Sequence, residues 1–356
     1  MGDLTEQLVA TVAQAFADKT PLSISGGDSK VHILGRNTVS NSTDTLELSP
    51  HSGVVEYHPA ELVITAKAGT PLTQINALLA AEGQILSFES PELSGRATLG
   101  GTLACNMSGP ARPWGGSIRD NVLGVQLING KGELLRFGGQ VMKNVAGYDV
   151  SRLQAGAQGT LGVITQVSLK VLPAPEHSIT LSYELDAAAA VALMNTKSAQ
   201  AKPINGAYWV DGVLFLRLSG AKDAVVHTAR LWGGELVADA ADLWQNLREF
   251  NHPFFSGDEP LWRLSHKPNA PISGENGDLL IDWGGAQRWL RGARDHSALE
   301  NLAEQAGGHA TLFRGGNRCT EVQHQLSAIQ KQLHQRVKHA FDPEGILNPG
   351  RLYSWM

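Results

Sequence analysis

Three glycine-rich stretches lie close together in the sequence, and their composition suits a ligand that carries phosphate groups. They cover residues 97–102 (ATLGGT), 114–120 (WGGSIRD) and 156–164 (GAQGTLGVI). Glycine lets a backbone approach a ligand closely and turn its N–H groups toward one point, which suits a diphosphate better than side chains do. The strand-like segment NVLGVQLINGKGELLRFG and the segment KNVAGYDVSRL separate the second stretch from the third. Together they indicate a cradle for a diphosphate.

Two other kinds of nucleotide-binding fold are disfavoured by the order of the expected elements. Gly156, Gly159 and Gly162 have some Rossmann-like spacing, but they follow the helix-like VSRLQAG and precede the strand-like GVITQVSLKVL. A Rossmann fingerprint requires the reverse order, in which a strand precedes the glycines and a helix follows them. The sequence also lacks a P-loop of the form GxxxxGK[ST]. We therefore expect neither a nicotinamide dehydrogenase nor a P-loop enzyme.

The composition bounds the class of protein. With 356 residues, of which 42% are hydrophobic, the chain can bury a sizeable core and is expected to form two domains. A net charge of -5 without a long basic run gives no reason to expect a nucleic-acid partner. Cys105 and Cys319 match no metal-binding spacing, so we expect buried thiols and a cytoplasmic location. We expect no signal peptide, and no run of about twenty apolar residues predicts a transmembrane helix.

Hydrophobic periodicity predicts the elements that position the glycine stretches. Residues 4–16 and 71–82 are expected to be helices, strand candidates surround them, and Pro173-Ala174-Pro175 marks a domain boundary. Beyond it, strands and helices alternate in a pattern that predicts an antiparallel sheet covered by helices on one side. The expected strands of this cap are 179–183, 207–210, 213–218, 262–265 and 279–283, and its expected helices are 186–198, 221–231 and 297–306.

The glycine stretches, the signature RDNVLG at 119–124 and the C-terminal segment EGILNPGRL together resemble a known family. The chain is similar to the PCMH-type FAD-binding domain of the vanillyl-alcohol oxidase/D-lactate dehydrogenase superfamily. Within it, the whole chain resembles the family of shorter FAD-binding subunits of bacterial glycolate oxidases, also called glycolate dehydrogenases. The resemblance implies an α+β fold with a FAD domain of two α+β subdomains at 1–175, a smaller antiparallel α+β cap at 176–320, and a tail at 321–356 that returns to the FAD domain.

The resemblance also implies a set of FAD contacts, carried over by position. The residues are Ser25, Gly26, Gly27, Asp28, Ser29, Pro91, Glu92, Thr98, Gly100, Gly101, Thr102, Asn106, Ser108, Gly162, Val163 and Ile164. A plain turn at 25–29 and a simple core strand at 162–164 remain the alternatives, and Asn348 is a further candidate. Many members attach the flavin covalently through a histidine directly after the two glycines. Asp28 stands there in this sequence, so we expect FAD to be bound non-covalently.

One motif of the resembled family is missing from the cap. Lactate- and glycolate-oxidising members carry a segment HxGDGNxH that binds a divalent metal and helps to hold the 2-hydroxy acid, and no such grouping occurs between residues 175 and 320. We therefore expect no metal site, and the catalytic residues stay unknown. Arg263 and His266 are weak candidates: on one face of a strand they could bind a carboxylate and move a proton. A pair without function on an exposed strand is the alternative.

The resemblance leaves three functions open. The first is the FAD-binding subunit of a glycolate oxidase, oxidising glycolate and also D-lactate beside a larger homologous FAD subunit and an iron–sulfur subunit that passes electrons to a respiratory acceptor. The second is a stand-alone FAD-dependent D-2-hydroxy-acid dehydrogenase, and the third is a structural flavoprotein scaffold. The missing histidine motif favours the first. Under it, the chain is cytoplasmic, with peripheral association with the inner membrane through its complex as an option.

Overall fold

A five-stranded antiparallel sheet forms the centre of the first part of the chain in the structure, a computed structural model that describes residues 3–37, 44–139, 148–273, 275 and 278–356. Its strands are β3 (Val54–His58), β4 (Val63–Lys67), β6 (Val122–Ile128), β7 (Leu134–Gly138) and β8 (Val163–Lys170), in the order β3-β4-β8-β6-β7. Apolar side chains of β4, β6 and β8 form one core with the helices α2 (Leu72–Ala81) and α3 (Leu99–Cys105). This core positions α3, which carries the first glycine stretch.

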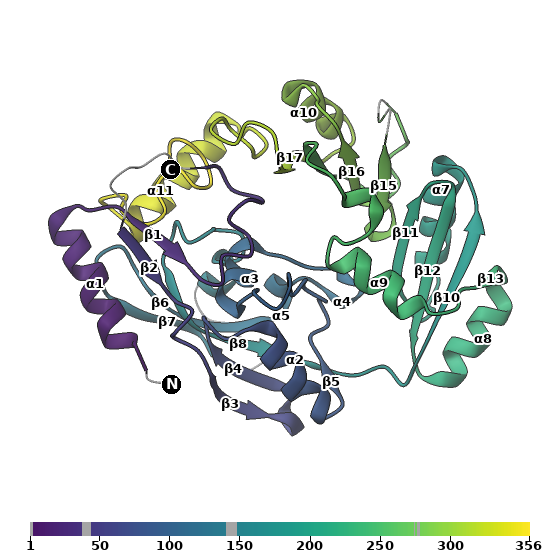
Figure 1. Ribbon diagram of the computed structural model, residues 1–356, viewed down its shortest axis with the longest axis horizontal. Coiled ribbons are helices and arrows are strands. Elements are labelled where there is room, and N and C mark those ends of the chain that lie inside the picture. Colours follow the sequence, from purple (N-terminus) through teal and green to yellow (C-terminus); the bar gives the residue numbers. More distant parts are fainter. Residues whose placement is uncertain (1–2, 38–43, 140–147, 274, 276–277) are drawn as a thin grey trace.

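A smaller layer covers this sheet at one end (Figure 1). It holds α1 (Thr5–Asp18), the parallel strands β1 (Leu22–Ser25) and β2 (Asp44–Glu47), and the C-terminal helix α11 (Ala328–Phe341). The tail pairs with β1, because Leu22 N donates to Ile346 O at 2.7 Å and Asn348 N donates to Leu22 O at 2.9 Å. The remaining short elements here are η1 (Pro59–Glu61), β5 (Gln84–Ile85), α4 (Arg112–Gly115), α5 (Ile118–Asn121), α6 (Val150–Leu153) and β9 (Leu172–Pro173).

The second part of the chain is built on an eight-stranded antiparallel sheet. The strands are β10 (His177–Glu184), β11 (Ile204–Val210), β12 (Val213–Gly220), β13 (Glu235–Leu236), β14 (Leu261–Ser265), β15 (Leu279–Asp282), β16 (Gln287–Arg291) and β17 (His309–Arg314). Their order is β13-β10-β12-β11-β15-β16-β14-β17. The predicted α+β class with an antiparallel cap sheet is confirmed, while β16 and β17 were not among the expected strands.

Helices lie on both faces of this cap sheet, so the expectation of a one-sided cover was wrong. The helices are α7 (Ala187–Ser198), α8 (Lys222–Trp232), α9 (Ala240–Arg248) and α10 (His296–Gln305), with short turns η2 (Pro253–Phe255) and η3 (Trp283–Gly285). Ala207 of β11 packs in the cluster of α7 and α8, whereas its neighbour Tyr208 packs with Trp244 of α9. Successive strand residues point to opposite faces, so α9 must lie opposite α7 and α8. In the described part of the chain, no helix is long and apolar enough to cross a membrane.

Polar contacts tie the cap to the first part of the chain. The Glu249 carboxylate accepts hydrogen bonds from Glu92 N at 3.0 Å and Leu93 N at 2.8 Å. Arg217 Nη2 donates to Glu89 Oε2 at 2.8 Å. These contacts hold the turn that leads to α3 against the cap. Because the two large sheets are separate and the tail pairs with β1, we propose the division into residues 1–175, 176–320 and 321–356.

Candidate FAD site and the cap cavity

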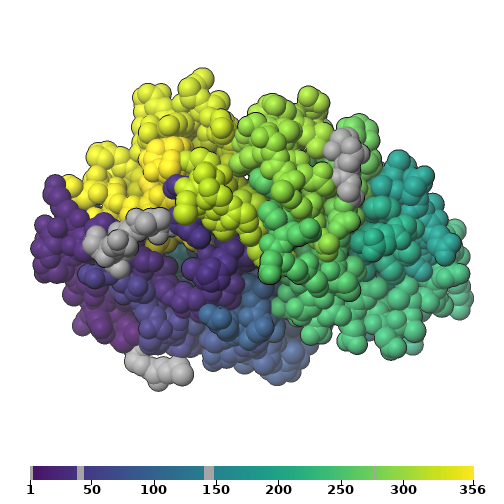
Figure 2. Space-filling model, turned by 45° about the horizontal axis from the view of Figure 1, so that its top comes forward, coloured from purple at the N-terminus to yellow at the C-terminus, as the bar shows by residue number. Residues whose placement is uncertain are grey.

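A cavity of about 390 Å³ opens between β1, α3 and the C-terminal tail. Figure 2 shows the surface hollowed between the purple N-terminal segment and the yellow C-terminal segment, with teal atoms at the bottom. The volume falls within the range of about 300–1,000 Å³ that is usual for small-molecule and cofactor sites. Its walls come from residues 22–37, 98–105, 158–164 and 348–351. Three of these four segments contain residues from the predicted set of FAD contacts, and the fourth contains the further candidate Asn348.

The loop after β1 forms one side of the cavity, and all five predicted residues from Ser25 to Ser29 line it. The loop lies directly against the segment that precedes α3. A Cβ atom on Gly27 would stand 1.8 Å from the carbonyl oxygen of Arg96, so only glycine fits at this position. Asp28 has φ 52° and accepts a hydrogen bond from Ser25 Oγ at 2.6 Å. Its side chain is exposed.

The first turn of α3 forms the adjoining wall. Thr98 is the N-cap residue, and its Oγ1 accepts a hydrogen bond from Gly101 N at 3.3 Å. A serine or threonine side chain in this position satisfies a backbone donor that the helix itself cannot. Thr98, Gly100 and Gly101 all line the cavity, as predicted contacts of the cofactor would.

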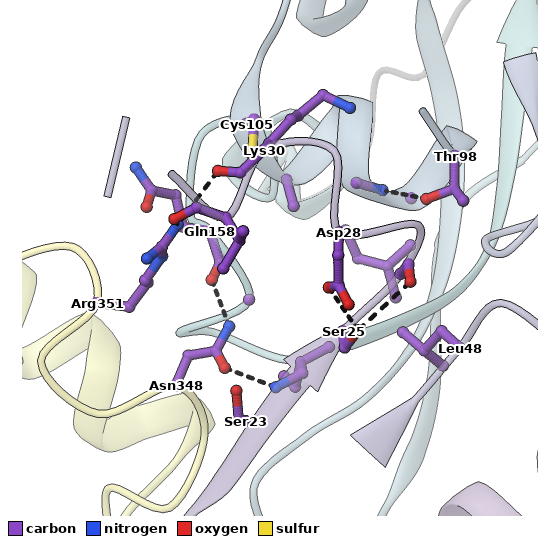
Figure 3. A pocket seen from close by; sticks show the side chains of 18 of the residues that line it. Ser23, Ser25, Asp28, Lys30, Leu48, Thr98, Cys105, Gln158, Asn348 and Arg351 are labelled. Carbon is purple, nitrogen blue, oxygen red and sulfur yellow. Dashed lines mark hydrogen bonds between the residues drawn. The ribbon is translucent and has the colours of Figure 1, made fainter. Parts of the chain in front are cut away.

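The strand β8 and the tail close the opposite end (Figure 3). Gly162 and Ile164 line the cavity, whereas Val163 points to the other face and is fully buried among apolar side chains of the α1 layer. This alternation is the one expected of a strand. Asn348 links the tail to β1 and to the third glycine stretch, because its Oδ1 accepts a hydrogen bond from Ile24 N and its Nδ2 donates one to Gln158 O, each at 2.7 Å. Asn348 also lines the cavity.

The cavity also contains side chains that were not among the predicted FAD contacts. Lys30, Cys105, Gln158 and Arg351 line it. Lys30 is 7% exposed, and its Nζ donates to Ser29 Oγ at 3.2 Å. Arg351 is held by the carbonyl oxygens of residues 30, 31 and 36. The sequence offers a signal for two of these residues. Lys30 directly follows the predicted loop, and Arg351 belongs to the same C-terminal motif as Asn348.

Six predicted contacts lie outside the wall of this cavity: Pro91, Glu92, Thr102, Asn106, Ser108 and Val163. Pro91 and Glu92 belong to the turn that Glu249 of the cap holds. Thr102 is fully buried in α3, and Asn106 ends that helix with φ 48°. Residues 143–147 of the segment KNVAGYDVSRL lie outside the described residues.

Ser108 instead lines a second, smaller cavity between the first part of the chain and the cap. Its volume is about 20 Å³, enough for one water molecule. Arg263, Asp282 and Gln287 of the cap face it together with aromatic side chains. Met107 also lines it, only two residues after Cys105 of the large cavity. The two cavities therefore lie on either side of the C-terminal end of α3.

The buried polar groups of the small cavity have shifted acidities. Burial lowers the pKa of Arg263 to about 10, with the charge of Arg112 acting in the same direction and the Cys105 thiol acting against it. The Nε of Arg263 has no hydrogen-bond partner among the described residues. Burial raises the pKa of the Asp282 carboxyl to about 7, against the hydrogen bond from Trp283 N and the charge of Arg217. The Arg263 guanidinium lies over the Phe313 ring, 5.7 Å from its centroid, and an arginine whose Nε lacks a partner favours an anionic ligand.

The expectation that Arg263 and His266 share one face of a strand was wrong. They are three residues apart, and His266 directly follows the last residue of β14, Ser265. The alternation along the strand, continued by one residue, places the two side chains on opposite sides. Arg263 faces Trp289 and Phe313, whereas Trp262 and Leu264 pack on the side of α10. Burial, followed by the charges of Arg288 and His309, lowers the pKa of His266 to about 4. The two side chains do not form a joint site.

Both cysteines were expected to be buried, and the structure places neither in a tightly packed core. Cys105 is half-buried and lines the large cavity, and Cys319 is exposed. Among the described residues, no group of three or more His, Cys, Asp or Glu side chains is arranged to hold a metal ion.

The residues of the large cavity fit a dinucleotide such as FAD. The glycine loop offers close backbone approach, and the positive charge of Arg351 suits the diphosphate. Lys30 adds a second cation to the same cavity. The carboxylate of Asp28 is turned to Ser25 and solvent, so it does not occupy the cavity. The apolar side chains of Leu22, Ile24, Leu48 and Ile164 give the cavity a lining suited to an aromatic ring.

Comparison with known families gives two matches. The FAD binding domain family matches residues 3–138, and the C-terminal domain family of FAD linked oxidases matches residues 315–352. The two matched segments contain the glycine loop, α3 and the C-terminal tail, which are three walls of the large cavity.

Comparison with curated proteins gives a match along the whole chain. The chain is 46% identical over 352 residues to the glycolate oxidase subunit GlcE of Escherichia coli (strain K12), covering 99% of this chain and 98% of that protein. It is 36% identical over 141 residues to the glycolate oxidase subunit GlcD of Bacillus subtilis (strain 168), covering 38% of this chain and 29% of that one. It is 29% identical over 177 residues to a D-lactate dehydrogenase of Anaerostipes hadrus, covering 50% and 36% of the two chains.

Among solved structures, an alkyldihydroxyacetonephosphate synthase superposes with a TM-score of 0.66. The superposition covers 97% of this chain and 74% of the synthase, at 16% sequence identity. At this identity the similarity shows a shared fold.

Proposed function

Because the chain belongs to the FAD-linked oxidase family and is related along its whole length to a glycolate oxidase subunit, we propose that it is the FAD-binding subunit of a glycolate oxidase. The complex oxidises glycolate, and also D-lactate, to the 2-oxo acid. The observation that carries this proposal is the 46% identity over 99% of the chain, together with a cavity built from the matched segments.

The large cavity holds the cofactor non-covalently. The backbone of Ser25 to Ser29 and the first turn of α3, from Thr98 to Gly101, surround the diphosphate, with Arg351 opposite. Gly162 and Ile164 line the end of the site beside the tail. When bound, FAD accepts a hydride equivalent from the alcohol carbon and releases electrons singly, which suits a relay to one-electron carriers.

The six predicted contacts outside this cavity support the site from around it. The turn of Pro91 and Glu92 fixes the approach to α3, and Asn106 and Ser108 lie where α3 ends beside the small cavity. Thr102 and Val163 fill the core behind the two walls. We assign these residues a positioning role.

The partners follow from the chemistry of the complex. The metal and base residues of the family are absent from this cap, so a larger homologous FAD subunit supplies the substrate site and an iron–sulfur subunit takes the electrons onward. The chain works in the cytoplasm, at the inner membrane where its complex associates with it. Arg263, whose Nε has no hydrogen-bond partner among the described residues, lies beside the small cavity and favours the alternative of a stand-alone 2-hydroxy-acid dehydrogenase, in which it binds the substrate carboxylate.

Dye-linked glycolate oxidation by the purified chain, beside the complex with its partner subunits, separates these functions. The subunit reading predicts that the chain alone is at least about a hundredfold slower than the complex, the scale of lacking a positioned base. Turnover by the chain alone near the rate of the complex would refute it. In that case Arg263→Met should abolish the activity of the single chain.

A further inference from the structure

Lys30 is a buried cation without a carboxylate partner at the edge of the FAD cavity. It is 7% exposed, and its Nζ donates to the neutral hydroxyl of Ser29 at 3.2 Å. Burial lowers the pKa of its ammonium group, with the Cys105 thiol and the Glu249 carboxylate acting more weakly in the opposite direction. Among the described residues, Lys30 takes part in no ion pair. A buried charge of this kind is costly unless a ligand compensates it.

The position of Lys30 indicates which part of the cofactor it meets. Figure 3 shows its side chain extending alongside Cys105, away from β1 and Asn348. Two cap residues are electrostatically coupled to this end of the cavity: Glu249 acts on Lys30, and Arg263 acts on Cys105. This end therefore faces the cap, whereas the end at Ile24 and Gly162 is enclosed by β1, β8 and the tail.

A flavin ring that exchanges hydride with a substrate or electrons with a partner needs its reacting edge where another molecule can reach it. The end of the cavity that faces the cap is the candidate for this edge, and the small cavity beside the cap begins close to it, at Met107. Because Glu249 of the cap acts on Lys30, we assign the ring, and not the adenine, to the end of the cavity beside Lys30.

We propose that Lys30 stabilises the negative charge that the flavin ring acquires on two-electron reduction, and so raises the reduction potential of the FAD in this chain. Reduction of the ring by two electrons and one proton, equivalent to one hydride, adds one negative charge. In the proposed reaction the hydride comes from the alcohol carbon of the 2-hydroxy acid, the hydroxyl proton passes to a base, and the product is the 2-oxo acid. A fixed positive charge near the ring is one of the means by which a protein tunes flavin chemistry.

The inference has a consequence that can be measured without turnover. If Lys30 interacts with the reduced ring more strongly than with the oxidised ring, it changes the ratio of the two FAD affinities. A role at the diphosphate would change both affinities equally and leave the potential unaltered.

The test compares Lys30→Met, which removes the charge and keeps the length, with Lys30→Arg, which keeps the charge. The apo chain is loaded with FAD, and the potential is measured by equilibration with reference dyes under reducing conditions. The dissociation constant of oxidised FAD is measured in parallel, with thermal unfolding as a check on folding. For Lys30→Met we expect an equilibrium constant for reduction at least about tenfold lower, which is about 30 mV for two electrons, and oxidised FAD bound within about threefold of wild type. Lys30→Arg should stay near the wild-type potential.

Two outcomes would overturn the inference. In the first, Lys30→Met changes the equilibrium constant for reduction less than about twofold. In the second, the variant weakens oxidised and reduced FAD equally, which would place Lys30 at the diphosphate. These two results are distinct from the result that would refute the proposed function. That result is a wild-type chain that binds no FAD, and it would be seen before any Lys30 variant is compared. The inference rests on the FAD site and not on the identity of the hydroxy acid.

Discussion

Gly101→Asp is the perturbation that most sharply tests the assigned FAD cavity. Gly101 lies in the first turn of α3 and lines the cavity. A Cβ atom there would have only Thr98 Oγ1 within 4 Å, at 3.1 Å. A small side chain therefore fits after a shift of a few tenths of an ångström, and any loss of binding can be assigned to the cavity and not to unfolding.

The magnitude follows from the charge that the substitution introduces. At an effective dielectric constant of about 20, two unit charges about 5 Å apart repel each other by about 3 kcal/mol. A carboxylate in the cavity would meet the diphosphate at about this range, so FAD binding should weaken at least roughly a hundredfold. Gly101→Asn has nearly the same shape without the charge and serves as the matched control.

The assay is titration of the apo chain with FAD, followed by the quenching of flavin fluorescence or by calorimetry. We expect Gly101→Asn to lose far less affinity than Gly101→Asp, and the difference to shrink at high salt because salt screens the repulsion. The reasoning is refuted if Asp and Asn weaken FAD binding equally, or if Gly101→Asp binds FAD as tightly as the wild-type chain.

Three further predictions address the cap. Burial raises the pKa of Asp282 to about 7 from an ordinary 3.8, so the contribution of its protonated form to stability is full below about pH 4 and is lost as the pH rises through 7. Relative to the wild type, the free energy of unfolding of Asp282→Asn, measured by urea titration, should therefore increase by up to about 4 kcal/mol between pH 4 and pH 8. A difference between the two proteins that does not change with pH would count against this prediction. His266→Ala should leave glycolate oxidation by the complex within about twofold of wild type, because His266 lies on the face of β14 away from both cavities, and a loss of a hundredfold would make it a base after all. Elemental analysis of the purified chain should find no stoichiometric zinc, manganese or iron, whereas one tightly held ion per chain would reveal a site from scattered ligands.

The glycine stretches could be interpreted from the sequence because their function depends on the backbone. Few residue types other than glycine fit at Gly26 and Gly27, because the backbone there lies directly against the segment that leads to Thr98. Side-chain positions depend instead on the packing of distant segments. Lys30 and Arg351 meet in one cavity because the tail returns to β1, a contact between residues more than 300 positions apart.

The errors in the cap have physical causes of the same kind. Arg263 and His266 are close in sequence, but the period of two along a strand separates residues three apart. The helix α9 was not among the expected helices, and the sheet face that it covers is set by Trp244 packing on Tyr208. The short strand β16 follows the turn at Trp283–Gly285, where Gly284 and Gly285 both have positive φ. This turn interrupts the alternation of apolar residues, so the pattern does not predict where β16 begins.

The flavin content of the purified chain tests the central claim most directly. The chain is expressed without its partner subunits, saturated with FAD, freed of excess cofactor and precipitated with acid, and the flavin is quantified in the supernatant and in the pellet. The account predicts one FAD per chain, all of it released to the supernatant, since Asp28 stands where a covalent histidyl bond would form. A chain that retains no FAD, or flavin that stays with the precipitated protein, would contradict it.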